Sequence, residues 1–273
     1  MNEAKNLALN THNNILLITL LALALSLLGA VPTHAQFADC STGLLQMPTA
    51  EMQEDGTLMI TNNFLNKHSL ASSGWNYNTF QYGVAVSFWG RVELGYVCTI
   101  FNGAWDPRPD EEITERQRII RNQDRHFNGR FCLLREGDFG LDWMPALVVG
   151  VNDFDKGMLQ MREGNGFFTR LYVVASKRFH TTYGEVGGHL GYQWNPRTDY
   201  SINAPCVGVN WHPVWLQQKG ILDGFDLVAE FDSRTFNLGF IVSILENHFE
   251  AMFELQGFQW INFGLRYKLH LKR

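Results

Sequence analysis

Ten ionisable side chains recur on the polar face of segments in which apolar and polar residues alternate. They are six carboxylates and four cations, namely Glu93, Glu185, Asp226, Glu230, Glu250, Glu254, Arg130, Arg170, Arg266 and Lys268. Because like charges repel strongly at low dielectric constant, we expect opposite signs to pair if these side chains share an enclosed interior. The set predicts either an ion-pair network that fills a closed barrel or a polar lining that passes or grips a hydrophilic solute or sugar chain. Two carboxylates could also hydrolyse a sugar bond, but that chemistry needs a defined separation that a sequence does not show.

The sequence carries no motif of a familiar catalytic, cofactor or metal site. It has no Gly-x-Ser-x-Gly elbow, no His-Glu-x-x-His and no phosphate-binding Gly-Lys-Ser/Thr loop, and its histidines are scattered singly. We therefore assign no catalytic residue, no cofactor and no metal ligand, and we predict a protein that is not an enzyme. A Ser, a His and an acid within hydrogen-bond reach would instead favour a membrane-embedded enzyme that modifies lipid or glycan.

Alternation with a period of two dominates the chain after residue 56 and predicts β-strands. In one example, Phe236, Leu238 and Phe240 share one face, while Asn237 and Gly239 share the other. Regular alternation predicts strands at 80–88, 92–100, 225–232, 236–245, 249–256 and 261–271. Less regular segments predict further strands at 57–65, 126–135, 144–152, 167–178, 183–194 and 206–212. This even number of strands, about 12, fits an antiparallel up-and-down barrel.

Two architectures produce such alternation: a soluble sandwich or barrel with apolar side chains inside, and a transmembrane barrel with them outside. The polar face is rich in Gly, Asn, Gln and charge of both signs, while the apolar face carries aromatics near strand ends, including Phe88, Trp194 and Trp211. Small residues and paired charges suit a narrow lumen, and terminal aromatics suit membrane interfaces. We therefore predict an all-β transmembrane barrel with Phe240 at mid-depth on the lipid side.

The predicted connections supply a second test, since outer-membrane barrels alternate long external loops with short periplasmic turns. Lengths alternate as far as residue 204. The pattern then fails, because 213–222 is long and the connections at Ser233-Arg234 and Gly257-Phe258 are short. Either the strand count is wrong there, or the barrel has low walls on one side.

The N-terminus and the charge balance bound location and partners. An apolar run from Ile15 to Ala30 follows Lys5 and precedes a cleavage site at Ala35, which predicts a secretory signal over residues 1–35. Cys40 stands ten residues beyond that run, which disfavours a lipid-modified N-terminus. The net charge of −5 disfavours nucleic acid as a partner. The cysteines are compatible with disulfides. Alternation places Cys98 outward and Cys132 inward, so a bridge between these two would contradict one of the assignments.

Several blocks resemble the YjbH-like outer-membrane proteins, in the same order along the chain. The opening block is Thr42 to Leu58 (TGLLQMPTAEMQEDGTL). Others are Leu133–Gly137 (LLREG), Pro145–Phe154 (PALVVGVNDF), Tyr172–Phe179 (YVVASKRF), Phe225–Asp232 (FDLVAEFD) and Asn262–Tyr267 (NFGLRY). The resemblance implies an outer-membrane β-barrel of a Gram-negative bacterium that is associated with production or export of exopolysaccharide or capsule. Longer relatives carry additional domains, so we expect other envelope proteins as partners, besides outer-membrane lipid and polysaccharide.

These inferences divide the chain into a signal peptide (1–35), a periplasmic lead-in (36–56) and an outer-membrane barrel (57–273). The lead-in could pack at the periplasmic mouth or start the first strand, or it could be a plug or a docking strip for a partner. We predict a non-enzymatic barrel that assists exopolysaccharide or capsule export or assembly. The alternative is a general, porin-like diffusion channel for small polar solutes.

Overall fold

The computed structural model describes residues 39–69, 77–102, 121–153, 168–195, 202–216 and 222–271. The predicted signal peptide and residues 36–38 of the predicted lead-in lie outside the described residues. Among the residues described, no helix is long and apolar enough to span a membrane.

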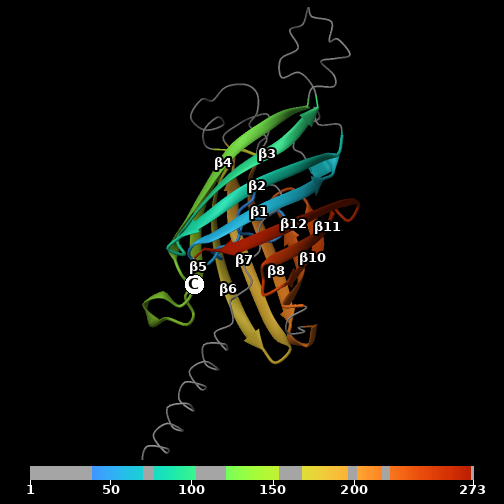
Figure 1. Ribbon diagram of the computed structural model, residues 1–273. Helices are drawn as coiled ribbons and strands as arrows, with labels where there is room; N and C mark the ends of the chain where they lie inside the picture. Colours follow the sequence, from blue (N-terminus) through green and yellow to red (C-terminus); the bar gives the residue numbers. More distant parts are fainter. Residues whose placement is uncertain are drawn as a thin grey trace, which may run out of the picture. The chain divides into compact units, whose positions relative to one another are not determined.

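The described chain forms one closed barrel of twelve antiparallel strands, each hydrogen-bonded to its neighbours in sequence (Figure 1). The strands are β1 Thr57–Leu65, β2 Thr79–Phe88, β3 Val92–Asn102, β4 Arg121–Leu134, β5 Ala146–Asn152, β6 Arg170–Thr181, β7 Gly184–Trp194, β8 Asn203–Pro213, β9 Gly224–Phe231, β10 Phe236–Ile244, β11 Phe249–Gln256 and β12 Trp260–His270. Closure joins β1 to β12, in register from Thr57 opposite His270 to Phe64 opposite Phe263. The predicted all-β, up-and-down barrel of about 12 strands is confirmed.

The strand boundaries differ from the prediction mainly where polar residues extend a ladder. β4 begins at Arg121 rather than at 126, because the polar residues before His126 still pair with the end of β3. β8 likewise runs from Asn203 rather than from 206. Such residues lack an apolar alternation that could mark them as strand, so the pattern underestimates strand length.

The barrel turns its apolar side chains outward and its polar side chains inward. Ile60, Leu94 and Leu265 on the outer face are 49%, 50% and 46% exposed. In contrast, charged side chains on the inner face are almost fully buried, with Lys268 at 0% and Arg266 at 1%. This facing agrees with the sequence pattern and is the reverse of a soluble barrel with an aliphatic centre.

A row of five phenylalanines crosses the outer face, each opposite the next in the strand register. They are Phe80, Phe64, Phe263, Phe253 and Phe240, from β2 through β1, β12 and β11 to β10. Ring centroids are 5.6 Å apart for Phe80 and Phe64, 4.9 Å for Phe64 and Phe263, and 5.3 Å for Phe253 and Phe240. Phe240 is the central residue of β10 and lies on its outer face.

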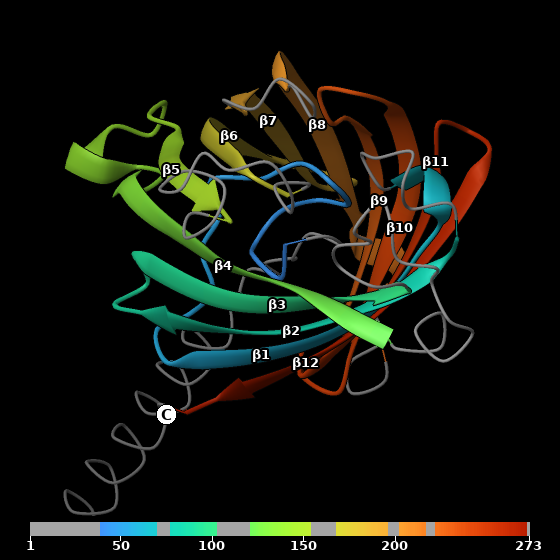
Figure 2. The same cartoon turned by 90° about the horizontal axis from the view of Figure 1, so that it is seen from above.

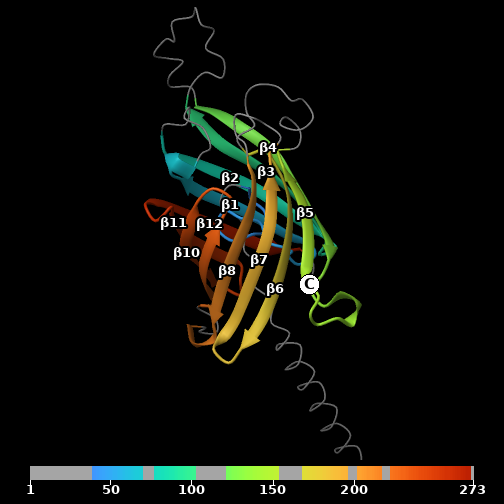
Figure 3. The same cartoon turned by 180° about the vertical axis from the view of Figure 1, so that it is seen from behind.

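The two ends of the barrel differ in their connections, and we name them the Thr57 end and the Leu65 end after the ends of β1. The Leu65 end carries the long connection after β3 and also two short turns, at 232–235 and 257–259. The Thr57 end carries the short turn between β6 and β7, visible from behind in Figure 3, and the longer connection between β8 and β9. Because all twelve strands are present, the failed alternation reflects low walls at β9–β12 and not a wrong strand count.

Candidate functional site

Residues Asp39 to Gln53, here called the plug, lie inside the barrel. Figure 2 looks down the barrel and shows this N-terminal segment crossing the lumen. Residues 39–50 and Gln53 are all buried. The lead-in therefore does not start the first strand, which begins at Thr57.

A tight loop at the tip of the plug packs on an apolar patch of the inner wall. Gly43 and Pro48 form an isolated antiparallel bridge, and the Leu44 amide donates to the Met47 carbonyl at 3.0 Å. The patch combines the loop side chains Leu44, Leu45 and Met47 with the wall side chains Cys206, Val228, Ile241 and Met252. Burial of these side chains stabilises the plug, at about 1.5–3 kcal/mol for each large one.

Glycines on the inner wall make room for the plug. A Cβ atom built on Gly208 would lie 2.5 Å from Leu44 Cδ1 and 2.6 Å from Met47 Sδ. A Cβ atom on Gly83 would lie 2.9 Å from Cys40 Cβ. Wall and plug are therefore shaped to each other at two separate points.

Two wall carboxylates accept hydrogen bonds from the plug main chain. Glu93 on β3 accepts from the Thr42 amide at 3.2 Å, the Thr42 hydroxyl at 2.7 Å and the Gln53 amide at 2.7 Å. Glu230 on β9 accepts from the amides of three consecutive plug residues, Leu45 to Met47, at 3.0, 2.7 and 3.4 Å. Glu254 on β11 also accepts from the Gln46 side-chain amide at 2.7 Å.

Three wall arginines bind oxygen atoms of the plug, both backbone carbonyls and side-chain carboxylates. Arg130 on β4 donates to the carbonyls of Thr42, Thr49 and Glu51, the last at 2.7 Å, and its Nε lies 3.7 Å from Glu93 Oε2. On β6, Arg170 pairs with Asp39, and Arg178 pairs with Glu51 at 2.7 Å. Burial raises the pKa of the Asp39 carboxyl above its ordinary value of 3.8, although Arg170 acts to lower it.

The structure places all ten residues singled out from the sequence on the lumen side, but it does not join them in one network. Lys268 and Arg266 pair with Glu250 at 2.5 and 3.3 Å. Arg130 pairs with Glu93, while Arg170, Glu230 and Glu254 bind the plug. Glu185 pairs with Arg178 at 2.9 Å. Asp226 meets His212 at 2.9 Å and accepts from Asn210 at 2.8 Å.

Sequence reasoning missed Arg178, Asp39 and Glu51. Arg178 shares a strand face with Arg170, so the period of two could have identified it. Nothing in the pattern of the lead-in indicates that Asp39 and Glu51 meet these arginines, because the plug forms no regular element.

A chain of hydrogen bonds links the plug to the buried carboxylate of Asp226. The Ala50 amide donates to Ser176 Oγ at 2.7 Å, Ser176 Oγ lies 2.8 Å from His189 Nδ1, and His189 Nε2 lies 2.9 Å from Asn210 Oδ1. Asn210 Nδ2 donates to Asp226, so Asn210 Oδ1 is an acceptor. In its neutral form, His189 therefore carries its proton on Nε2 and accepts the Ser176 hydroxyl proton on Nδ1.

This chain brings a Ser and a His together, which is the arrangement that would favour an enzyme. The acid, however, is joined to His189 through the side chain of Asn210. Plug residue Ala50 also covers Ser176, which is 3% exposed. In this arrangement the chain anchors the plug and holds no open nucleophile.

The four cysteines are free thiols. Cys98 lies on the outer face opposite Tyr82, and Cys132 lies on the inner face, as the alternation predicted. Cys40 packs in the lumen against Gly83, and burial raises the pKa of its thiol to about 12. Its fully buried side chain leaves no room for an attached lipid. Among the residues described, no group of His, Cys, Asp and Glu is placed to hold a metal ion.

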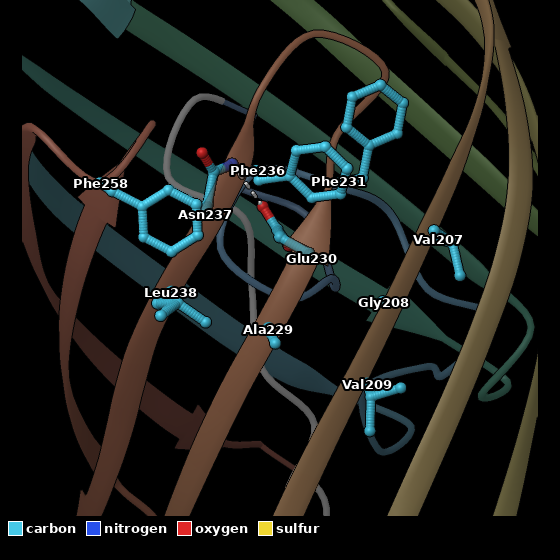
Figure 4. A pocket seen from close by; sticks show the side chains of 10 residues that line it. All are labelled: Val207, Gly208, Val209, Ala229, Glu230, Phe231, Phe236, Asn237, Leu238 and Phe258. Atoms are coloured by element: carbon cyan, nitrogen blue, oxygen red, sulfur yellow. Dashed lines mark hydrogen bonds between the residues drawn. The ribbon is translucent and has the colours of Figure 1, made fainter.

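A groove of about 320 Å³ opens on the other side of the wall from the plug, over β8, β9 and β10 (Figure 4). Its exposed lining is apolar and includes Val209, Leu238 and Phe258. Glu230 and Asn237 also border it, but their side chains are buried and joined by a hydrogen bond of 3.1 Å. The groove therefore belongs to the apolar outer face and not to the polar lumen.

Comparison with known proteins gives a match to one family model. No curated protein matches the chain. The YjbH family model, described as "Exopolysaccharide biosynthesis protein YbjH", matches residues 39–272 and so spans the plug and the barrel. The chain belongs to the YjbH family of exopolysaccharide biosynthesis proteins.

Proposed function

We propose that this protein is an outer-membrane barrel that assists the export or assembly of exopolysaccharide or capsule and catalyses no reaction itself. The observation that carries the proposal is a barrel with an apolar outer wall whose charged lumen holds the chain's own N-terminal segment. Family membership gives the process, which is exopolysaccharide biosynthesis. A barrel of this kind can assist that process by spanning the outer membrane.

The outer wall supports a location in the outer membrane. Large apolar side chains on the outer face are close to half exposed, and the row of phenylalanines continues over five strands. Water-exposed apolar surface of this extent is costly, whereas hydrocarbon accommodates it. The apolar N-terminal run with its cleavage site provides the route to the periplasm. The Thr57 end would face the periplasm, since the longest connection lies at the Leu65 end.

The plug distinguishes this proposal from a general diffusion channel. Fifteen residues, Asp39 to Gln53, occupy the lumen and are bound from β3, β4, β6, β9 and β11. A channel for small solutes needs a lumen open to water. Single-channel recording tests the difference, because a constitutive diffusion channel would conduct steadily, and the proposed barrel would stay closed at rest.

The absence of catalysis is tested at Ser176, whose hydroxyl lies 2.8 Å from His189 Nδ1 in the described lumen. A fluorophosphonate probe labels activated serine nucleophiles. We expect no labelling of Ser176 in the folded protein, because Ala50 covers it. Labelling that disappears in Ser176→Ala would show an activated nucleophile and would replace this proposal with an enzymatic one.

The proposed role itself is tested in cells that carry a deletion of the gene. We expect secreted polysaccharide to fall and cell-associated polysaccharide to rise, with both restored by the full chain. Unchanged secretion in the deletion strain would exclude the role. We also propose that other envelope proteins act beside the barrel and that nucleic acid is not a partner.

A further inference from the structure

We propose that the lumen wall beneath the plug is a binding surface for a neutral glycan strand, and that the plug occupies this surface when no glycan is bound. The inference rests on the proposed function, because it names the ligand class of the same lumen.

The wall recognises the plug largely through main-chain groups. Glu93, Glu230 and Ser176 accept from the backbone amides of six plug residues. Arg130 donates to three backbone carbonyls. Main-chain N–H and C=O groups are a regular series of donors and acceptors without net charge. The wall therefore binds the plug more through hydrogen bonds to its main chain than through contacts with particular plug side chains.

A ligand that replaces the plug must satisfy the same buried charges. Glu93 and Glu230 need donors, and Arg130, Arg170 and Arg178 need acceptors, since a buried charge without a partner costs several kcal/mol. A sugar hydroxyl is both donor and acceptor, and two vicinal hydroxyls can bind the two oxygens of one carboxylate. A chain of sugars can thus offer donors and acceptors to the wall groups that bind the plug.

Mixed charge on the wall disfavours charged polymers. The ion-paired wall carboxylates Glu93, Glu185 and Glu250 would repel a polyanion. Arg130, Arg170 and Arg178 would repel a polycation. Because neither sign dominates, the wall selects a neutral polyhydroxylated chain over either.

Two buried polar side chains give independent support. Tyr172 on β6 is 5% exposed and packs in the same cluster as plug residue Ala50. Its hydroxyl has no hydrogen-bond partner in the described structure. Asn152 on β5 is fully buried, and neither its carbonyl nor its amide group has a partner among the described residues. Buried polar groups are normally satisfied, so these two indicate a ligand that brings its own donors and acceptors.

Hydrogen exchange of the wild-type full chain provides the first test, with two neutral hexasaccharides, a β-linked and an α-linked glucose hexamer, as probes. We expect at least one probe to raise the exchange rates of the Leu45 and Gln46 amides at least tenfold, because it takes their place on Glu230. Hexagalacturonate, which is anionic, should leave these rates unchanged. If neither neutral probe changes them, or if the anionic probe acts more strongly, the inference is wrong.

A disulfide provides the second test. Gly83→Cys places a thiol beside the native Cys40. A Cβ atom at position 83 would lie 2.9 Å from Cys40 Cβ, so a small shift of the plug allows a bond. Oxidation should fix the plug and weaken hexasaccharide binding at least tenfold, and reduction should restore it. The matched control is Gly191→Cys, which lies opposite Cys206 in the strand register. A disulfide between these two positions joins β7 to β8 and does not involve a plug residue.

Equal binding by oxidised and reduced Gly83→Cys would overturn the inference, and so would a comparable loss in the oxidised control. These outcomes are separate from those of the deletion strain. Normal polysaccharide secretion without the gene would remove the proposed export role and leave the binding surface. Impaired secretion together with no displacement of the plug would do the reverse.

Discussion

The amide of Gln46 donates a 2.7 Å hydrogen bond to Glu230 Oε1, although the two residues are 184 positions apart in the chain. The same carboxylate also accepts from Leu45, and Asn237 donates to it across the β9–β10 ladder. The segment that precedes β1 is therefore bound directly to β9. The lumen and the plug have to be considered as one structure.

Removing this carboxylate should loosen the plug. Glu230→Ala leaves the Leu45 and Gln46 amides buried without an acceptor, at a cost of about 1–3 kcal/mol for each. We expect the free energy of local opening, measured by hydrogen exchange at Gln46, to fall by about 2–4 kcal/mol. Glu230→Gln keeps one acceptor oxygen and should lose less than half as much. Unchanged exchange in Glu230→Ala would show that the carboxylate does not hold the plug.

The facing of β10 is tested at its centre. Phe240 points outward between Phe253 and Phe225, with ring centroids at 5.3 and 5.8 Å. Phe240→Arg puts a charge at mid-depth on the proposed lipid side and should cost about 2–4 kcal/mol. We expect impaired insertion and loss of heat-modifiable migration on gels, while Phe240→Leu should insert normally. Normal insertion of the arginine variant would contradict the assigned facing.

Asp39 should make stability depend on pH. Its folded pKa is raised above 3.8 by burial, against the lowering effects of Arg170 and Arg234. Between 3.8 and the raised value, the folded chain keeps a proton that the unfolded chain releases, so this group's contribution to stability falls as pH rises. Asp39→Asn removes that contribution.

The measurement is the difference in free energy of unfolding between wild type and Asp39→Asn, from urea titrations across pH 4 to 8. We expect the difference to move against the wild type as pH rises from the acid end, and then to level off. A difference that moves in favour of the wild type would mean that Arg170, and not burial, dominates at Asp39.

Cys40 reports whether the plug is seated. Burial raises its pKa from 9.0 to about 12, so the thiolate fraction at pH 8 falls about a thousandfold. In a variant with the other three cysteines changed to serine, we expect iodoacetamide to label Cys40 at least a hundredfold more slowly than in urea. Rapid labelling of the folded protein would place Cys40 outside the lumen.

The barrel was accessible to sequence reasoning because each strand with one apolar face repeats the same period of two. The twelve strands follow from that period, and so does the lumen side of residues such as Glu250 and Lys268. Boundaries were less accessible, since polar residues at the start of β4 pair without alternation. The short turn at 232–235 agrees with the prediction. Only the closed sheet of twelve strands shows that it reflects low walls and not a wrong strand count.

The plug could not be placed from its sequence. Its residues form one isolated bridge and no ladder, so no periodic pattern marks their position. The pairs that hold it, such as Arg178 with Glu51, join segments 127 residues apart, and no local signal connects them. The inner-wall charges therefore predicted a self-contained network or a polar lining, whereas several of them bind the plug.

The most direct test is polysaccharide secretion by cells whose only copy carries Gly83→Cys. The account predicts low secretion while a disulfide to Cys40 holds the plug, and recovery when a reductant that crosses the outer membrane breaks it. Cells with Gly191→Cys should secrete normally in both conditions. Equal secretion by Gly83→Cys cells before and after reduction, with the disulfide verified on non-reducing gels, would contradict the claim that the plug must leave the lumen.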